Sequence, residues 1–282
     1  MVKKIAIITI NHNHGEMIRR TIESIVQLPC DNKYKLFVIN NVDDQPTKSW
    51  ITNTLPKVEL IENQQPRGFA SNVNRVISQN PTFDFYLLLN PDVICLPGMI
   101  DGLINVMQED EKIGAAGPKL LNMDGSVQPS RRRFASFPVL VLRALHIDKI
   151  FNNLPAVDHY LMNESTFTGV EEVDWITGAV MILRKSALDQ VGLMDERFYM
   201  YFEDEDLCCR MWQRGWKVCY ISNIEAFHAH IAAGRNKLFT KANFQHILSA
   251  VKMLIKYNGK ITQCYDKQRA NRPIVSGKTG KS

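Results

Sequence analysis

The sequence lacks the cysteine spacings of a metal site or a redox motif. No CxxC pair occurs, and several cysteines stand inside apolar runs, where they behave as small hydrophobic side chains. The cysteines are Cys30, Cys95, Cys208, Cys209, Cys219 and Cys264. We therefore expect all six to be reduced, and the sequence does not indicate a disulfide-stabilised scaffold.

Long hydrophobic segments are also missing. No part of the chain approaches the roughly 18 consecutive apolar residues that a membrane-spanning helix needs. The N-terminal stretch MVKKIAIITINHNH has a basic start, but its apolar run is short and no small-residue cleavage site follows. We therefore expect no signal peptide, and a cytoplasmic location.

The chain carries no large net charge. The formal net charge is +5 over 282 residues, and 45% of the residues are hydrophobic, enough for a substantial core. The positive excess lies at the C-terminal end, where residues 251–282 hold eight lysines and arginines but a single acid, Asp266. A basic tail of this kind favours an anionic surface over a nucleic-acid groove, so we expect no nucleic-acid partner.

Short apolar runs alternate with amphipathic segments through about residue 120. The runs KIAIITI, KLFVIN, VELI and FYLLLN are typical of strands buried on both faces of a parallel sheet. After the first run, Ile18, Ile22 and Ile25 form the apolar stripe of a helix. The alternation predicts an α/β fold with a Rossmann-like, mostly parallel central sheet flanked by helices.

Polar segments follow each of these strands, at 11–14, 40–44, 62–72 and 90–93. Ligands of open parallel sheets bind beyond the carboxyl ends of the strands, although short polar turns are expected at any strand end. Within the last segment, Asp92 is placed to hold a divalent cation that carries a phosphate ligand. The alternative for this residue is a simple Asn-Pro-Asp turn.

The second half of the chain begins with a loosely patterned stretch, residues 122–172, which we interpret as a candidate lid or as a plain surface connection. The run VDWITGAVMIL (173–183) predicts one strand, and KVCYI (217–221) predicts another. A helix is expected over 238–256, packed on the core, on a second subunit or on a membrane surface. Its apolar stripe consists of Phe244, Ile247, Leu248, Val251, Leu254 and Ile255.

Four consecutive carboxylates, Glu203 to Asp206, lie between aromatic residues and an amphipathic run. Acids in a first helical turn complement the helix dipole, which explains one or two of them. Successive helical side chains diverge by about 100°, so the four cannot share one pocket. We expect two of them to face a site, where one is a candidate general base. The other two, Glu205 and Asp206, should begin the helix and meet solvent or Arg210.

Two histidines, His228 and His230, lie on one side of the extended segment EAFHAH. A neutral imidazole beside a carboxylate-bound cation is a reasonable additional ligand. A structural or exposed histidine is the alternative for each of them.

Taken in order, these motifs resemble glycosyltransferase family 2, in the branch that contains rhamnosyltransferase-like enzymes of polysaccharide assembly. The resemblance covers about residues 4–258 and rests on NHN, RGFASNVNRVI, YLLLNPDVICLPG and DGSVQPSRRRF. Its most specific part is VDWITGAVMILRKSALDQVGLMDERFYMYFEDEDLCCRMWQRGWKVCYI. The resemblance implies a GT-A fold with a C-terminal helical extension.

This resemblance also implies a division of the chain. The GT-A domain would span 1–258, with a nucleotide-sugar-binding half to about residue 120 and an acceptor and catalytic half over about 121–236. The C-terminal helix would be 237–258, and a basic, flexible tail would follow over 259–282.

Roles for individual residues follow from the same resemblance. Asp92 occupies the last position of the family's metal-binding acid motif and would hold Mg²⁺ or Mn²⁺, with His228 as a further ligand and His230 as the fallback. Asp204 would be the catalytic base and Glu203 a supporting acid. The residues lining the donor site would be Asn11, Asn40, Arg67, Gly68, Asn74 and Asp92.

The implied activity is inverting transfer of a sugar, with rhamnose as a candidate, from a nucleotide-diphosphate sugar to a glycan or lipid-linked acceptor. Asn40 stands where the family has an acid near the nucleotide base, so base selectivity is open. The alternative is a catalytically silent sugar-nucleotide-binding protein. A nucleotidyltransferase is disfavoured, because the first strand is not followed by a Gly-rich phosphate loop. A homodimer and a peripheral position at the inner membrane face are further expectations.

Overall fold

The computed structural model describes all residues except 1, 137, 141–153, 163–166, 230–240 and 264–282, and the side chains of 241–243 are likewise outside it. The strands of the central sheet are β1 (Lys4–Asn11), β2 (Lys33–Asn40), β3 (Glu59–Glu62), β4 (Phe85–Leu89), β5 (Val93–Cys95), β6 (Ile113–Leu121), β7 (Val127–Gln128), β9 (Val170–Glu172), β11 (Val180–Arg184) and β12 (Lys217–His228). Two short strands, β8 (Arg131–Arg132) and β10 (Trp175–Ile176), pair with each other. The helices are α1 (Glu16–Val26), α2 (Gln45–Thr54), α3 (Phe69–Gln79), α4 (Met99–Glu109), α7 (Pro155–Leu161), α8 (Lys185–Val191), α9 (Glu203–Gln213), α10 (Lys241–Lys256) and the 3₁₀ turn η1 (Ile261–Gln263).

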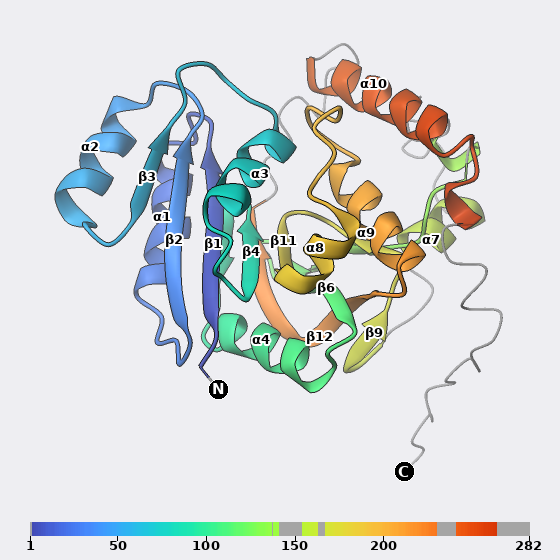
Figure 1. The fold of residues 1–282 in the computed structure, drawn as a ribbon, viewed down its shortest axis with the longest axis horizontal. Helices are drawn as coiled ribbons and strands as arrows, with labels where there is room; N and C mark the ends of the chain where they lie inside the picture. The colour runs from blue at the N-terminus through green and yellow to red at the C-terminus, as the bar shows by residue number, and fades with distance from the viewer. Residues whose placement is uncertain (1, 137, 141–153, 163–166, 230–240, 264–282) are drawn as a thin grey trace.

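The sheet has the order β3-β2-β1-β4-β11-β6-β12-β5, with helices on both faces (Figure 1). Its first four strands are parallel, which confirms the predicted alternation of strands and helices. Strand β11 runs antiparallel to β4, so its first residue, Val180, pairs with Leu89 at the end of β4. In the same way β5 runs antiparallel to β12, and Val93 pairs with His228. The start of β11 and the end of β12 therefore lie at the carboxyl edge of the parallel strands.

Each face of the sheet carries its own hydrophobic core. Along β1, Ile5 and Ile7 pack in the core that contains the buried residues of α1 and α4. The alternate residues Ala6 and Ile8 pack in the other core, with α3 and α9. Both sets of side chains must be apolar, because successive strand residues point to opposite faces. This double burial explains the near-continuous apolar run of the sequence.

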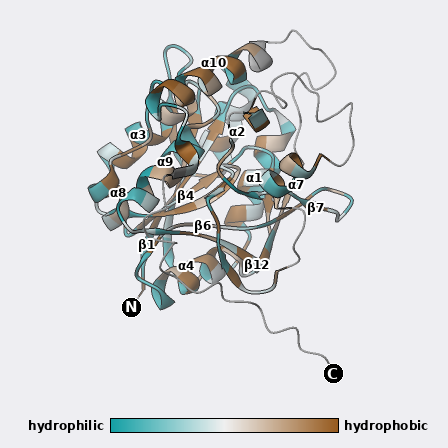
Figure 2. Ribbon diagram, turned by 90° about the vertical axis from the view of Figure 1, so that its right-hand side faces the viewer, coloured by the Kyte–Doolittle hydropathy of each residue, from teal (hydrophilic) through white to brown (hydrophobic). Residues whose placement is uncertain are grey.

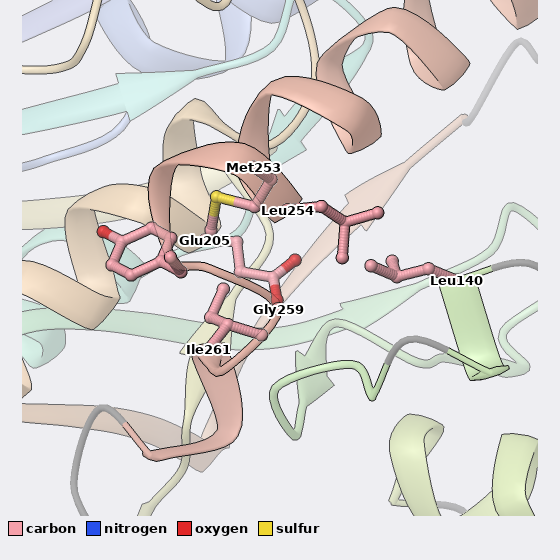
Figure 3. Close-up of a pocket in the computed structure, with 7 residues that line it drawn as sticks. Leu140, Glu205, Met253, Leu254, Gly259 and Ile261 are labelled. Atoms are coloured by element: carbon pink, nitrogen blue, oxygen red, sulfur yellow. The ribbon is translucent and has the colours of Figure 1, made fainter.

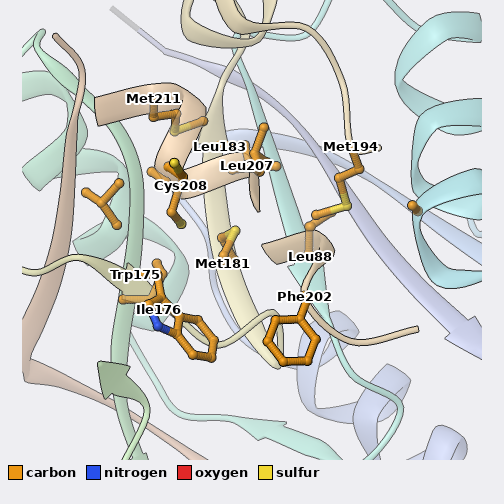
Figure 4. Packing of buried hydrophobic residues seen from close by; sticks show 14 of the residues in the cluster. Leu88, Trp175, Ile176, Met181, Leu183, Met194, Phe202, Leu207, Cys208 and Met211 are labelled. Carbon is orange, nitrogen blue, oxygen red and sulfur yellow. The ribbon is translucent and has the colours of Figure 1, made fainter. Parts of the chain in front are cut away.

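Helix α9 is held in place by its apolar face. Leu207, Cys208 and Met211 are fully buried and share one core with Met181 and Leu183 of β11 (Figure 4). This packing determines where the first turn of α9, with its four acids, meets the edge of the sheet.

The expectation of a single strand over 173–183 is wrong. The segment forms β10 and β11, which belong to different sheets, with a break at Thr177 and Gly178. Here the N–H of Thr177 donates to the carbonyl of Ser130 at 3.0 Å, and the N–H of Gly178 donates to Asp204 at 2.9 Å. Those donors leave the strand ladder for partners distant in sequence, which an apolar pattern does not reveal.

The C-terminal helix is present as α10, but its apolar stripe does not pack on the core. Its buried side chains are Ser249, Ala250 and Met253. The exposed side chains are Phe244, Ile247, Leu248, Val251 and Ile255, with exposed fractions from 37% to 71%. The core-packing interpretation is therefore wrong for five of the six stripe residues, and the expected flexible tail lies outside the described residues beyond 263.

The cysteine prediction is confirmed for four residues and wrong for one. Cys30, Cys95, Cys208 and Cys219 are free, whereas Cys209 is disulfide-bonded. In the part of the chain that the structure describes, no helix is long and apolar enough to cross a bilayer.

Candidate active site

The turn after β4 and the end of β12 bring two of the predicted site residues together. Asp92 Oδ1 lies 3.2 Å from His228 Nε2, and both side chains are mostly buried. The carbonyl of Asp92 also accepts a hydrogen bond from the N–H of Ala229 at 2.9 Å, which joins the turn to the end of β12. His230, the fallback ligand, lies outside the described residues.

The neighbours of His228 determine which ring nitrogen carries its proton. The amide nitrogen of Gln128 donates to Asn122 Oδ1 and to the carbonyl of His228, both at 2.7 Å. The Gln128 Oε1 atom therefore faces His228 Nδ1, at 2.9 Å, and Nδ1 must be the donor. In the neutral ring, Nε2 then turns a lone pair toward the Asp92 carboxylate.

Two acceptors that face each other at 3.2 Å need a proton or a cation between them. An imidazole nitrogen, a carboxylate oxygen and an outer hydrogen bond that orients the ring are features of divalent-metal sites in proteins. The described residues contain no cluster of three or more His, Cys, Asp or Glu suited to a metal. Asp92 and His228 therefore fit a cation that would take its remaining ligands from water and from the phosphate oxygens of a donor.

Asp204 lies in the first turn of α9, and each of its oxygens accepts a backbone hydrogen bond. The N–H of Gly178 donates to Oδ2 and the N–H of Glu205 donates to Oδ1, both at 2.9 Å. Burial raises the pKa of Asp204, while these two bonds and the charge of Arg132 oppose the rise. The result is an oriented carboxylate that is more basic than an exposed aspartate.

The other three acids of the run are buried, whereas Asp204 is partly exposed. Asp206 forms an ion pair with Arg210 at 2.9 Å, as predicted, and accepts a hydrogen bond from the Tyr257 hydroxyl at 2.8 Å. Glu203 is 6% exposed, and burial followed by the charge of Asp204 raises its pKa. Of the four, Asp204 is therefore the one that can meet a substrate.

Glu205 corrects the sequence expectation, because it faces neither solvent nor Arg210. Its side chain is 1% exposed and lines a small apolar pocket with Leu140, Met253 and Leu254 (Figure 3). This pocket leaves no room for a water molecule, and it lies on the side of α9 that faces α10. Burial, and then the charge of Asp204, raises the pKa of Glu205 to about 8. Burial thus favours the protonated, neutral form of Glu205 in the folded protein.

Glu205→Gln should stabilise the protein in a pH-dependent way. The folded-state pKa of about 8 exceeds the ordinary value of 4.5, so the wild type loses stability as pH rises between these values. Glutamine has no such ionisation, and the variant should be more stable by about 3 kcal/mol at pH 7. The difference should vanish near pH 4.5. Urea unfolding at pH 5 and pH 7 measures it, and equal stabilities at pH 7 would show that Glu205 is ionised.

The turn that carries Asp92 and the helix turn that carries Asp204 are both hydrogen-bonded to the segment before β11. The N–H of Asn90 donates to the carbonyl of Ala179 at 2.8 Å, and the neighbouring Gly178 donates to Asp204. The Asn-Pro-Asp turn and the first turn of α9 are thus held on the same short segment before β11.

Gly68 brings the predicted donor segment against the loop that leads into α9. The N–H of Phe69 donates to the carbonyl of Tyr199 at 2.9 Å. A Cβ atom at position 68 would lie 2.6 Å from that carbonyl oxygen, so only glycine allows this approach. Since Phe69 uses its N–H for Tyr199, the start of α3 has one fewer donor for a phosphate group.

Three of the predicted donor residues use their amides inside the protein. Asn11 donates to Asn40 Oδ1 and to Asp44 Oδ2, both at 2.8 Å, and accepts from the N–H of His14. Asn74 donates to the carbonyl of Met194 and accepts from its N–H. These amides hold the loops that border the site, and we leave them out of the donor contacts that we propose.

Arg67 is presented to solvent by a network of asparagines. Asn41 Oδ1 accepts hydrogen bonds from the N–H of Arg67 at 2.9 Å and from the Asn63 and Asn72 amides at 2.8 and 3.1 Å. The Arg67 residue is exposed at the carboxyl edge of the sheet. Of the predicted donor residues other than Asp92, Arg67 is therefore the one whose side chain is accessible.

Sequence reasoning assigned no role to Arg132, Asp44 or His14. Arg132 Cζ lies 5.5 Å from the centre of the Trp175 ring, and its charge acts on Asp204. Burial raises the pKa of Asp44, but hydrogen bonds from Asn11 and Thr47 hold it below its ordinary value. Burial lowers the pKa of His14, which lies within electrostatic reach of Asp92. Their positions could have indicated them, because each lies in one of the family motifs or in a polar segment that follows a strand.

The chain belongs to glycosyltransferase family 2, since the family described as "Glycosyltransferase like family 2" matches residues 3–247. Its relatives include the N-acetylglucosaminyl-diphospho-decaprenol L-rhamnosyltransferase of Mycobacterium tuberculosis, 28% identical over 81% of this chain and 76% of that protein. Rhamnosyltransferase WbbL of Escherichia coli is also 28% identical, over 89% of this chain and 92% of that protein.

Two solved structures show that the fold is GT-A. They are GalNAc-T7 with UDP, GalNAc and Mn²⁺, and the mannosyltransferase PcManGT from Pyrobaculum calidifontis with GDP-Man and Mn²⁺. Their TM-scores are 0.62 and 0.60, at 14% identity. The alignments cover 80% and 89% of this chain, and 43% and 65% of those chains.

Proposed function

We propose that this protein is an inverting glycosyltransferase that moves a sugar from a nucleotide-diphosphate donor to an acceptor hydroxyl, with Asp204 as the general base. The observation that carries the proposal is the setting of Asp204. It is the partly exposed member of an otherwise buried acid run, and two backbone N–H groups aim its carboxylate. A carboxylate so oriented can accept a proton from a hydroxyl as that hydroxyl attacks the anomeric carbon.

The remaining residues have complementary tasks. Asp92 and His228 would hold a divalent cation, which supplies positive charge to stabilise the departing nucleotide diphosphate. Gln128 orients His228 through its Nδ1 atom. Arg67 would contact the donor from the loop between β3 and α3. Glu203 would support Asp204 from the same turn of α9. The mannosyltransferase and GalNAc-T7 structures, both with Mn²⁺, support the metal assignment.

For the substrates we propose a rhamnosyl donor and a lipid-linked acceptor. The names of the Mycobacterium tuberculosis and Escherichia coli relatives support rhamnose, and the first of them names a decaprenol-linked acceptor. Such an acceptor would place the protein peripherally at the inner membrane face. The replacement of the family's usual acid by Asn40 leaves the nucleotide base open, and the silent binding protein remains the alternative function.

A panel of nucleotide sugars tests the proposal by thermal unfolding with and without Mn²⁺. A ligand at 100 times its Kd adds about 2.7 kcal/mol to the unfolding free energy, and we expect one donor to do so in the presence of the metal. Donor turnover with an isoprenoid-diphosphate-linked acceptor then separates enzyme from binding protein. Stabilisation without transfer or donor hydrolysis would favour the silent binding protein, and no stabilisation by any sugar nucleotide would contradict both.

A further inference from the structure

The outer face of α10 is an apolar surface that no described part of the chain covers. Phe244, Ile247 and Ile255 are 69%, 45% and 71% exposed, and Leu248 and Val251 extend the same face. Figure 1 shows α10 at the outside of the molecule, beyond α9 from the sheet, and Figure 2 shows hydrophobic residues along it. We call these five side chains the α10 face.

Two exposed tyrosines of the loop before α9 add to this surface. Tyr199 and Tyr201 are 45% and 37% exposed. The Tyr201 ring lies 5.2 Å from the ring of His246 on α10, so the loop and the helix adjoin. Aromatic side chains with one polar end are typical of the boundary between water and lipid.

The orientation of α10 is determined by polar contacts on its inner side. Ser249 Oγ donates to the carbonyl of Met200 at 2.9 Å, and Lys252 Nζ donates to the carbonyl of Arg197 at 2.6 Å. Lys256 Nζ lies 2.7 Å from Asp195. Because hydrogen bonds and an ion pair hold the inner side, the apolar side is left facing outward in a defined position.

We propose that the α10 face, with Tyr199 and Tyr201, docks on the surface of an anionic lipid bilayer. Large apolar side chains on one side of an interfacial helix enter the headgroup boundary, and basic groups beside them are attracted to anionic lipids. This inference rests on the proposed lipid-linked acceptor and names the surface by which the protein reaches it.

Charge favours a bilayer over a second copy of the chain. Lys252 and Lys256 of α10 are engaged on its inner side, but residues 257–282, which follow the helix in the sequence, hold six lysines and arginines against a single acid, Asp266. Two copies joined through this helix would bring two of these basic segments together, which is unfavourable. An anionic membrane instead complements the charge of these residues.

The loop that contacts α10 leads directly into the helix turn that carries the proposed base. The loop residues that contact α10, Met200 and Tyr201, lie within four positions of Asp204 in sequence. Docking through α10 would therefore bring the side of the site that precedes α9 close to the lipid surface. An acceptor whose diphosphate lies at that surface could then present its sugar hydroxyl to Asp204.

Vesicle flotation with the full chain tests this surface. Wild type should float with vesicles of phosphatidylcholine and phosphatidylglycerol in equal parts, and much less with phosphatidylcholine alone. The variant Phe244→Gln/Ile247→Gln/Ile255→Gln should lose at least about tenfold in partitioning onto the anionic vesicles. A matched control, Val2→Gln/Met123→Gln/Val170→Gln, changes three side chains of similar exposure away from α10 and should float as wild type does.

Circular dichroism and the donor-induced thermal shift, measured on the same variants, separate docking from folding and from the proposed function. All variants should keep the fold and the shift. Equal flotation of wild type and the α10 variant would overturn the proposal, as would no flotation of wild type. A wild-type dimer in sedimentation that the α10 variant dissociates would assign the face to a second copy instead. A missing donor shift in wild type would count against the proposed function alone.

Discussion

Asp204→Asn should reduce sugar transfer by about 100- to 10,000-fold, the range expected for loss of a general base. Asparagine keeps the size and one of the two oxygens that accept the N–H groups of Gly178 and Glu205, and α9 should stay in place because its apolar residues remain packed in the core. It cannot take a proton from the acceptor hydroxyl. Donor binding should therefore survive, with a thermal shift close to that of wild type. Steady-state transfer and the thermal shift, measured in parallel, give the two quantities.

The neighbouring acid supplies a matched control for this substitution. Glu205→Gln makes the same chemical change one residue away, but in the apolar pocket on the other side of α9, and should leave transfer within about twofold. Glu203→Gln should lower transfer less than Asp204→Asn does, because burial and the charge of Asp204 favour the protonated form of Glu203. Transfer by Asp204→Asn at more than a tenth of the wild-type rate would mean that another group accepts the proton.

Asp92→Asn should abolish the Mn²⁺-dependent part of donor binding and lower transfer by about 100-fold or more, because a bound metal contributes several kcal/mol to charge stabilisation. The amide carries no charge to hold a divalent cation, and its nitrogen cannot act as a ligand. The readout that does not depend on turnover is the thermal shift with Mn²⁺ and donor together. Without metal, wild type and variant should unfold at similar temperatures.

The outer hydrogen bond of His228 gives a graded version of this experiment. Gln128→Leu removes the acceptor at Nδ1 and should weaken metal affinity by about 10- to 100-fold. Asp43→Asn, an exposed acid that follows the neighbouring strand β2, serves as the control and should change neither quantity. An undiminished Mn²⁺ shift in Asp92→Asn would remove Asp92 from the metal site.

The fold was largely predictable because hydrophobic burial drives folding, and the spacing of apolar residues along the chain shows which side chains are buried. Strand β1 is apolar throughout because its side chains alternate between two cores, and α1 carries its core contacts at helical spacing. The parallel arrangement of the first four strands followed from that pattern. The break between β10 and β11 did not, because it depends on Ser130 and Asp204, which lie far from Thr177 and Gly178 in the chain.

The candidate site was partly predictable for the same reason. The strand-end rule and the family motifs indicated Asp92, His228 and Asp204. They did not indicate that the amides of Asn11, Asn40 and Asn74 form hydrogen bonds with other protein groups. Asn74 illustrates the limit, since its partner Met194 is 120 positions away. A hydrogen-bond partner at that separation is decided by packing, and no local pattern encodes it.

By itself, the sequence determined the class of fold, the family, and which segments end at the edge of the sheet, because hydrophobic periodicity and ordered motifs are local properties of the chain. Only the tertiary structure decided how the four adjacent acids divide. Helix α9 rotates each successive side chain by about 100°, so Asp204 meets the site, Glu205 enters an apolar pocket and Asp206 reaches Arg210. The same holds for α10. Its apolar stripe faces outward because hydrogen bonds hold the opposite side of the helix, and hydrophobic periodicity does not reveal those bonds.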